Sequence, residues 1–216
     1  VADIVTWARS SALRMSPDFD RQQQEGMGEL LDLMIGEGII TRFTGGPTTV
    51  YGIEPANVGV ASYYRNTIVH FFINKAIIEL ALIAVAEHGE FEPDQQVEAL
   101  FWAEVLELRD LYKFEFFYPP TEIFQAEIAA ELDRIDDSWR HELSTGVKGA
   151  RRLLAMMTPH VAHMTLQMYV ESYSIAADLL ANLEANETID ESDFVDRCMN
   201  YGKQALLQRR VSSEAS

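Results

Sequence analysis

The longest apolar stretch of the chain, residues 62–88, most constrains how the chain can fold. As one helix of about 27 residues it would span roughly 40 Å, at about 1.5 Å per residue, and it is too long for a strand. A transmembrane helix needs roughly 18 residues nearly free of charge, whereas four charged residues divide this stretch into uncharged pieces of nine, three and seven. These charged residues are Arg65, Lys75, Glu79 and Glu87. Because a helix that is apolar nearly all round is usually buried, the stretch predicts a central helix surrounded by other helices.

Polar side chains follow one line along this expected helix. At about 100° per residue they fall within one narrow sector. They are Tyr63, Asn66, His70 and Asn74. A buried polar group without a hydrogen bond costs about 1 to 3 kcal/mol, so this polar seam needs partners. Two interpretations are open: hydrogen bonds to neighbouring helices, or a position beside a polar cleft or at a contact with another domain.

The same residues carry a family resemblance. Residues 63–70 read Tyr-Tyr-Arg-Asn-x-Ile-x-His and are followed by the long hydrophobic stretch. This pattern resembles the C-terminal region of membrane-bound glycerol-3-phosphate acyltransferases of the PlsB type, and the resemblance covers most of the chain, more weakly after Glu98. It implies an enzyme of phospholipid biosynthesis that transfers a fatty acyl group from acyl-CoA or acyl carrier protein to the sn-1 hydroxyl of glycerol 3-phosphate.

The composition describes an acidic, helix-rich globular protein. The chain has 216 residues, of which 48% are hydrophobic, and only 12 glycines and 7 prolines, so it can bury a sizeable core. A net charge of −17 argues against nucleic acid as a partner, since phosphate binding needs Lys and Arg, and against simple electrostatic binding to anionic lipid. The single cysteine, Cys198, favours a reducing compartment. The chain begins with Val1, and we expect it to be a piece of a longer protein.

We expect an all-α fold, a helical bundle with one small β-hairpin near residues 39–53. The hairpin follows from two β-rich runs around Gly45-Gly46-Pro47. Helix followed by hairpin also suggests a winged helix, but residues 19–38 hold one basic and five acidic residues, which argues against a DNA-reading version. The other helices are expected over residues 3–14, 19–37, 94–117, 121–142, 150–184 and about 190–210.

Local signals mark several helix ends. Thr121 is the expected N-cap of the helix over 121–142, and Ser192 or Asp190 caps the last helix. Pro159 should kink or break the helix over 150–184 near Met157. No linker forces a boundary, so we expect one helical domain over 1–216. Its expected parts are helices plus the hairpin over 1–55 and a helical bundle over 56–211.

The sequence offers no recognisable catalytic site. The resembled enzymes use a His-x4-Asp pair, in which the histidine takes a proton from the glycerol hydroxyl and the aspartate orients the imidazole. None of the five histidines has an aspartate five positions later. His160 and His163, with Glu171 further on, have helical spacing but lack the repeated Glu-x-x-His of a dinuclear site. We therefore expect no catalytic or substrate-binding residue, no metal and no cofactor in this chain.

Two groups of residues are candidates for contacts. Aromatic side chains beside the helix break at Pro119-Pro120 could anchor at a membrane interface or pack against another helix; they are Phe114, Phe116, Phe117 and Tyr118. The motif and the seam are candidates for contact with the catalytic domain of the same polypeptide: Tyr63, Tyr64, Arg65, Asn66, His70 and Asn74. We hypothesise that Arg65 and Asn66 bind across that interface.

We therefore expect a structural and membrane-docking C-terminal region of such an acyltransferase, at the cytoplasmic face of the inner cell membrane and inactive by itself. The alternative is a non-catalytic all-α module that binds a ligand or dimerises. That module would need a closed apolar pocket and no dependence on another domain. A stand-alone helical enzyme is disfavoured for want of a site.

Overall fold

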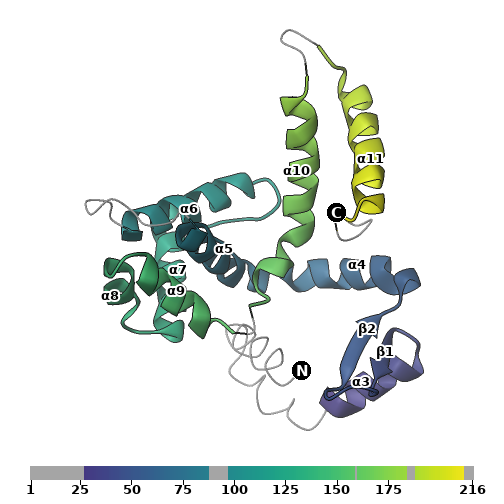
Figure 1. Ribbon diagram of the computed structural model, residues 1–216, viewed down its shortest axis with the longest axis horizontal. Coiled ribbons are helices and arrows are strands. Elements are labelled where there is room, and N and C mark those ends of the chain that lie inside the picture. The colour runs from purple at the N-terminus through teal and green to yellow at the C-terminus, as the bar shows by residue number, and fades with distance from the viewer. Residues whose placement is uncertain (1–26, 88–96, 159, 184–187, 212–216) are drawn as a thin grey trace. The chain divides into compact units, whose positions relative to one another are not determined.

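The computed structural model describes residues 27–87, 97–158, 160–183 and 188–211 (Figure 1). These residues form α-helices and one two-stranded antiparallel hairpin, which confirms the predicted fold class. The expected helix over 3–14 lies outside the described residues. The chain divides into two compact units, Val1–Ala162 and His163–Ser216, which we describe separately. The expectation of one domain over 1–216 stays a prediction.

The first unit begins with a helix and the hairpin. Helix α3 (Met27–Gly36) is followed by β1 (Ile40–Phe43) and β2 (Val50–Ile53), with Ile40 opposite Ile53. Gly38, with φ 69°, ends α3 in a left-handed conformation that glycine adopts without steric cost. An exposed ion pair of 2.7 Å between Arg42 and Asp32 joins β1 to α3.

The predicted single helix over 62–88 is wrong, because the stretch is broken. After the 3-10 turn η1 (Pro55–Asn57), helix α4 (Val58–Ile68) ends in a second 3-10 turn, η2 (Val69–Phe71). Helix α5 (Ile73–Glu87) then continues at an angle of 80° to the preceding segment. The polar seam therefore does not lie on one helix.

The break has a local cause at the end of α4. The Thr67 hydroxyl donates a 2.7 Å hydrogen bond to the carbonyl oxygen of Tyr64, an arrangement that often bends helices. Thr67 is followed by Ile68 and Val69, and β-branched residues lower helix propensity. No glycine or proline marks the break, so the usual sequence signal is absent.

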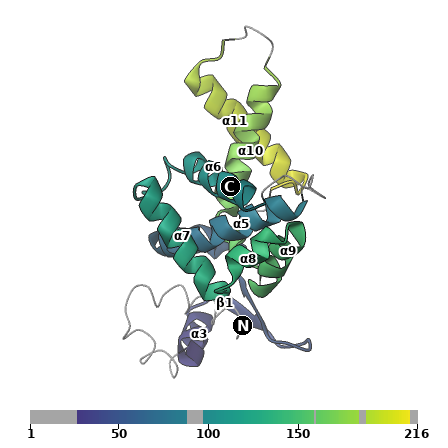
Figure 2. The same ribbon diagram turned by 90° about the vertical axis from the view of Figure 1, so that its left-hand side faces the viewer.

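The core of the first unit surrounds α5 (Figure 2). Helix α5 packs against α6 (Val97–Leu111), α7 (Thr121–Ile135) and α9 (Val147–Met156). Nine of the 15 residues of α5 are buried, so the prediction of a central, surrounded helix is confirmed for this half of the stretch.

Two predicted helices end earlier than expected. Helix α6 ends at Leu111 rather than Phe117. The helix expected over 121–142 is split into α7 and α8 (Trp139–Ser144). Between them Asp136 accepts hydrogen bonds from the backbone N–H of Ser138, at 2.8 Å, and from its hydroxyl, at 2.7 Å. These bonds lower the pKa of Asp136 and compete with helix continuation.

The predicted cap at Thr121 is also wrong. Thr121 is the first residue of α7, and Pro120 occupies the N-cap position without a side-chain hydrogen bond. A proline at this point costs little, because the first backbone N–H groups of a helix have no intrahelical partner.

The corner between α8 and α9 depends on a close backbone approach at Gly149. A Cβ atom at this position would overlap the carbonyl oxygen of Glu142. Helix α9 then ends at Met156, which confirms the expected break near Met157; Pro159 itself lies outside the described residues.

The described residues of the second unit form a 3-10 turn and two helices. These are η3 (His163–Thr165), α10 (Gln167–Ala181) and α11 (Glu191–Leu207). Of the two predicted caps, Asp190 is the one observed, accepting a 3.1 Å bond from the Ser192 N–H. Helices α10 and α11 pack on each other, and the Tyr201 hydroxyl donates to Asp178 at 3.1 Å.

Candidate functional site

Helix α4 displays the Tyr-Tyr-Arg-Asn motif. Every residue of α4 is described, and none is buried. Tyr63 and Tyr64 are largely exposed, and their rings meet edge to face with centroids 5.6 Å apart. Arg65 is half-buried and donates a 3.3 Å hydrogen bond to the side-chain oxygen of Asn66. The motif therefore lies on a helix that contributes nothing to the core of the unit.

The other two seam residues lie beyond the bend. His70 belongs to η2, is exposed, and has its ring centroid 3.7 Å from that of Phe71. Asn74 belongs to α5 and donates a 3.3 Å hydrogen bond to Glu127 on α7. The bond to a neighbouring helix satisfies part of the seam in the way that the first interpretation expected.

A polar pocket of about 180 Å³ joins residues from both groups of candidates. His70 and Asn74 come from the seam. Phe117 and Tyr118 come from the aromatic cluster, which consists of Phe114, Phe116, Phe117 and Tyr118. The complete lining is His70, Phe71, Ile73, Asn74, Phe117, Tyr118, Pro119 and Glu127. The structure thus brings together side chains that the sequence separates by more than a helix, whereas Tyr63 to Asn66 remain outside this pocket.

The aromatic cluster is divided between packed and exposed rings. Phe116 meets the ring of Tyr112 at 6.3 Å, and Tyr118 meets that of Phe124 at 5.3 Å. Phe114 and Phe117 are instead almost completely exposed. Two of the four membrane-contact candidates are therefore available for contact, and the other two pack against neighbouring rings.

Tyr118 is held at the polar pocket by an arginine. The guanidinium of Arg109 lies 5.7 Å from the Tyr118 ring centroid and donates a 3.1 Å bond to the carbonyl oxygen of Pro119. Burial and the neighbouring Tyr112 raise the pKa of Tyr118, while Arg109 opposes them. Within the described residues the hydroxyl of Tyr118 has no hydrogen-bond partner. This hydroxyl is buried and stays protonated at neutral pH.

A second pocket was not anticipated from the sequence. This apolar pocket, of about 300 Å³, is lined by α3, both strands, η1 and α4. Its lining is Met34, Ile39, Ile40, Ile53, Asn57, Val60, Ala61 and Tyr64. A signal was present in the sequence, because Ile39, Ile40 and Ile53 flank the hairpin at matching ends. The pocket is open at its rim, where Val60 and Tyr64 are exposed.

Buried charges in the core were also missed. On α5, Lys75 lies 3.6 Å from Glu131 of α7, which also pairs with Arg134 at 2.6 Å. Glu79, one turn after Lys75, is fully buried, with Nδ1 of His160 at 3.6 Å. Two charges four residues apart in an apolar helix predict charged partners on the facing elements. The sequence therefore contained a signal for these buried ion pairs.

The histidines show no metal-site geometry in the described part of the chain, where no group of three or more His, Cys, Asp or Glu side chains could hold an ion. His141 is exposed on α8, His163 lies in η3, and His88 lies outside the described residues. Glu171 accepts a 2.8 Å hydrogen bond from Gln167.

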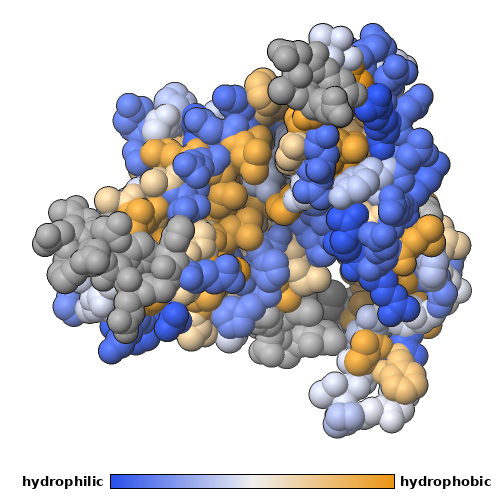
Figure 3. Space-filling view, turned by 45° about the horizontal axis from the view of Figure 1, so that its top comes forward, coloured by the Kyte–Doolittle hydropathy of each residue, from blue (hydrophilic) through white to orange (hydrophobic). Residues whose placement is uncertain are grey.

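Apolar side chains reach the surface in several places. Figure 3 shows orange, apolar patches between blue, hydrophilic residues on one face of the molecule. Within the described residues no single helix has the length and apolar content to cross a membrane. Residues 55–71 and 73–87 pass that test only as a pair bent by 80°.

Comparison with known proteins places the chain in an acyltransferase family. A family model described as "Glycerol-3-phosphate acyltransferase C-terminal region" matches residues 1–216. Proteins named "Putative acyltransferase plsB1" from Mycobacterium bovis and from two strains of Mycobacterium tuberculosis are 34% identical to the chain over 189 residues. That alignment covers 86% of this chain but only 30% of each relative, so the chain spans less than a third of these proteins. No solved structure matches the chain.

Proposed function

Because the chain belongs to the family of the glycerol-3-phosphate acyltransferase C-terminal region, we propose that it is the non-catalytic helical part of a longer acyltransferase. That enzyme would transfer a fatty acyl group from acyl-CoA or acyl carrier protein to the sn-1 hydroxyl of glycerol 3-phosphate, in phospholipid biosynthesis. Two observations support this assignment: the relatives extend far beyond the aligned region, and the sequence has no His-x4-Asp pair.

The exposure of α4 is the observation that supports a role in contact with another domain. A helix of 11 residues with no buried side chain gains little from its own propensity, since isolated helices shorter than about 12 to 15 residues are marginal in water. Contacts from another part of the polypeptide would stabilise the exposed side of this helix. We assign those contacts to the catalytic domain of the same polypeptide, which Arg65 and Asn66 would contact from two different faces of α4.

Arginine chemistry suits such an interface. The planar guanidinium can form a bidentate bond to a carboxylate or bind backbone carbonyls. Removing one member of a buried charged pair costs about 2 to 5 kcal/mol, largely because the other member is left unpaired. An interface role for Arg65 thus predicts a loss of stability, whereas a role in binding substrate phosphate predicts a loss of affinity.

The test is Arg65→Ala in the full-length enzyme. We expect a lower Tm and lower activity together, with a nearly unchanged KM for glycerol 3-phosphate per folded molecule. Arg42→Ala is the matched control, because Arg42 forms an exposed pair with Asp32 and such pairs contribute about 0 to 1 kcal/mol. A raised KM at unchanged Tm would overturn the interface assignment.

A membrane contact is proposed for Phe114 and Phe117, at the cytoplasmic face of the inner membrane. Their exposure supports it, since aromatic rings favour the membrane interface. Interfacial binding through apolar area is only weakly sensitive to salt. Liposome sedimentation should therefore show binding that survives high salt and weakens in a Phe114→Ser, Phe117→Ser double variant. Binding that needs anionic lipid and vanishes in salt would count against this contact.

A further inference from the structure

The apolar pocket between α3, the hairpin and α4 has a lining that selects for hydrocarbon. No charged side chain contributes to it. Asn57 supplies an amide group, but its Nδ2 donates a 2.6 Å hydrogen bond to the carbonyl oxygen of Gly38. The remaining polar groups of the lining are the side-chain oxygen of Asn57 and the hydroxyl of Tyr64. A strongly polar ligand entering this space would therefore lose more hydrogen bonds to water than it gains. An alkyl chain makes no hydrogen bonds to water, so it loses none on entering the pocket.

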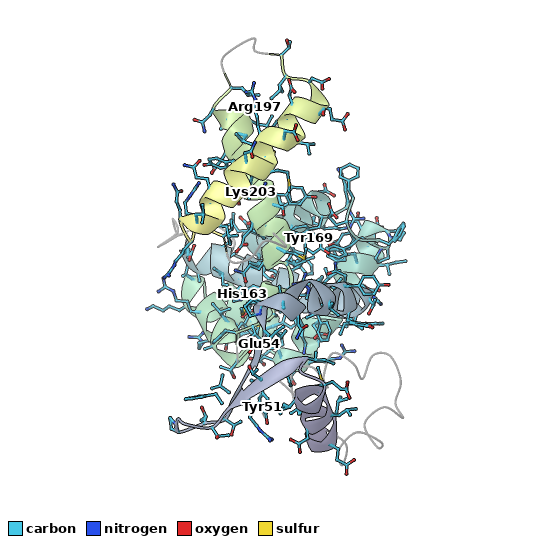
Figure 4. All side chains as sticks on the ribbon, turned by 90° about the vertical axis from the view of Figure 1, so that its right-hand side faces the viewer. Tyr51, Glu54, His163, Tyr169, Arg197 and Lys203 are labelled. Carbon is cyan, nitrogen blue, oxygen red and sulfur yellow. The ribbon has the colours of Figure 1, made fainter. Side chains whose placement is uncertain are left out.

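The pocket is large enough for part of a chain. Its volume of about 300 Å³ lies at the lower end of the roughly 300 to 1,000 Å³ usual for small-molecule sites. Ile40 is buried in it, while Ile53 and Val60 are exposed at its rim. Tyr51 on β2 and Glu54, between β2 and η1, mark this part of the molecule in Figure 4.

Helix α4 lines the pocket with part of its surface. At about 100° per residue, Val60, Ala61 and Tyr64 face the apolar pocket together. Asn66 points away from that sector, whereas Arg65 lies at its edge, about 40° beyond Ala61. Tyr64 belongs both to the motif and to the pocket lining. If the motif contacts the catalytic domain, as proposed above, the pocket therefore borders that interface, and interfaces between domains are common places for ligand sites.

We propose that this apolar pocket holds the distal part of the alkyl chain of the acyl donor and so helps to select its length. The inference rests on the proposed acyl transfer. A membrane lipid could supply the same chemistry, but the proposed membrane contacts, Phe114 and Phe117, lie in another part of the unit, and the linings of the two pockets share no residue. The donor is therefore the occupant to which the geometry points.

The first test fills the pocket in the full-length enzyme with Ala61→Trp. Gly59→Trp is the matched control, since it adds the same side chain to the same helix, on a different side, where the space around the residue is open. Each methylene kept out of an apolar site lowers affinity about fourfold. We expect Ala61→Trp to lower the preference for palmitoyl-CoA over octanoyl-CoA, as the ratio of kcat/KM, by at least about tenfold, with octanoyl-CoA used as well as before. Gly59→Trp should leave the ratio unchanged.

The second test does not depend on a variant that folds. Full-length enzyme is photolysed with an acyl-CoA that carries a diazirine at the methyl end of its chain, and separately with a diazirine phosphatidylcholine in vesicles. We expect the acyl-CoA adduct to map to residues 53–64 and to disappear when palmitoyl-CoA is added. An adduct elsewhere, or one formed here by the phospholipid and not displaced by palmitoyl-CoA, overturns the proposal.

The proposed acyl transfer and the proposed role of the pocket can be refuted by different results. A wild-type enzyme that transfers no acyl group refutes the proposed function, and the photolysis still reports what occupies the pocket. An active enzyme whose folded Ala61→Trp variant keeps the wild-type chain preference refutes the pocket alone.

Discussion

Helices α4 and α5 are neighbours in the chain, separated only by a 3-10 turn, yet they are stabilised in opposite ways. Nine of the 15 residues of α5 are buried between three other helices. None of the 11 residues of α4 is buried, although its sequence includes two tyrosines, three valine or isoleucine residues and only one charge. Apolar composition therefore decides burial only where other elements supply a surface to pack against.

The largest expected effect compares one isoleucine from each helix. Ile77 on α5 has 0% of its surface exposed, and Ile68 on α4 has 47%. Ile77→Ala should destabilise the chain by about 2 to 5 kcal/mol, because it leaves a cavity. Ile68→Ala should change stability by no more than about 0.5 kcal/mol. Urea unfolding of the 216-residue chain measures both, and equal losses would show that α4 packs as α5 does.

A smaller effect compares two ion pairs. Lys75→Met removes a partner of the buried Glu131, which keeps Arg134 at 2.6 Å, so we expect a loss of about 1 to 3 kcal/mol. Arg42→Met breaks the exposed pair with Asp32 and should cost about 0 to 1 kcal/mol. The same unfolding experiment in low and high salt sharpens the contrast, because salt screens exposed pairs more than buried ones. A larger loss for Arg42→Met would contradict this interpretation.

The sequence predicted the fold class and most elements because their signals are local. The hairpin has Gly45-Gly46-Pro47 between two β-rich runs, and the break after Met156 precedes Pro159. The bend at Val69 was missed because it depends on a threonine hydroxyl and on which half of the stretch meets α6, α7 and α9. Tertiary contacts of this kind leave no simple periodic pattern.

The candidate sites show the same limit. Phe114 is exposed and Phe116 is packed, but both are phenylalanine, so the sequence alone could not tell which of the two would be buried. The polar pocket joins His70 to Phe117 across two helices, and no spacing in the sequence relates them. The apolar pocket needed the register of the hairpin, in which Ile40 stands opposite Ile53. Lys75 and Glu79 were visible as interruptions of an apolar run, but their partners on other elements were not.

The close approach at Gly149 has a consequence for comparing related sequences. Since even a methyl group there would overlap the Glu142 carbonyl, any homologue that keeps the α8–α9 corner must have glycine at the equivalent position. That glycine is therefore an anchor point for aligning this part of the chain. A homologue with another residue there has either been misaligned or has rebuilt the corner during its evolution.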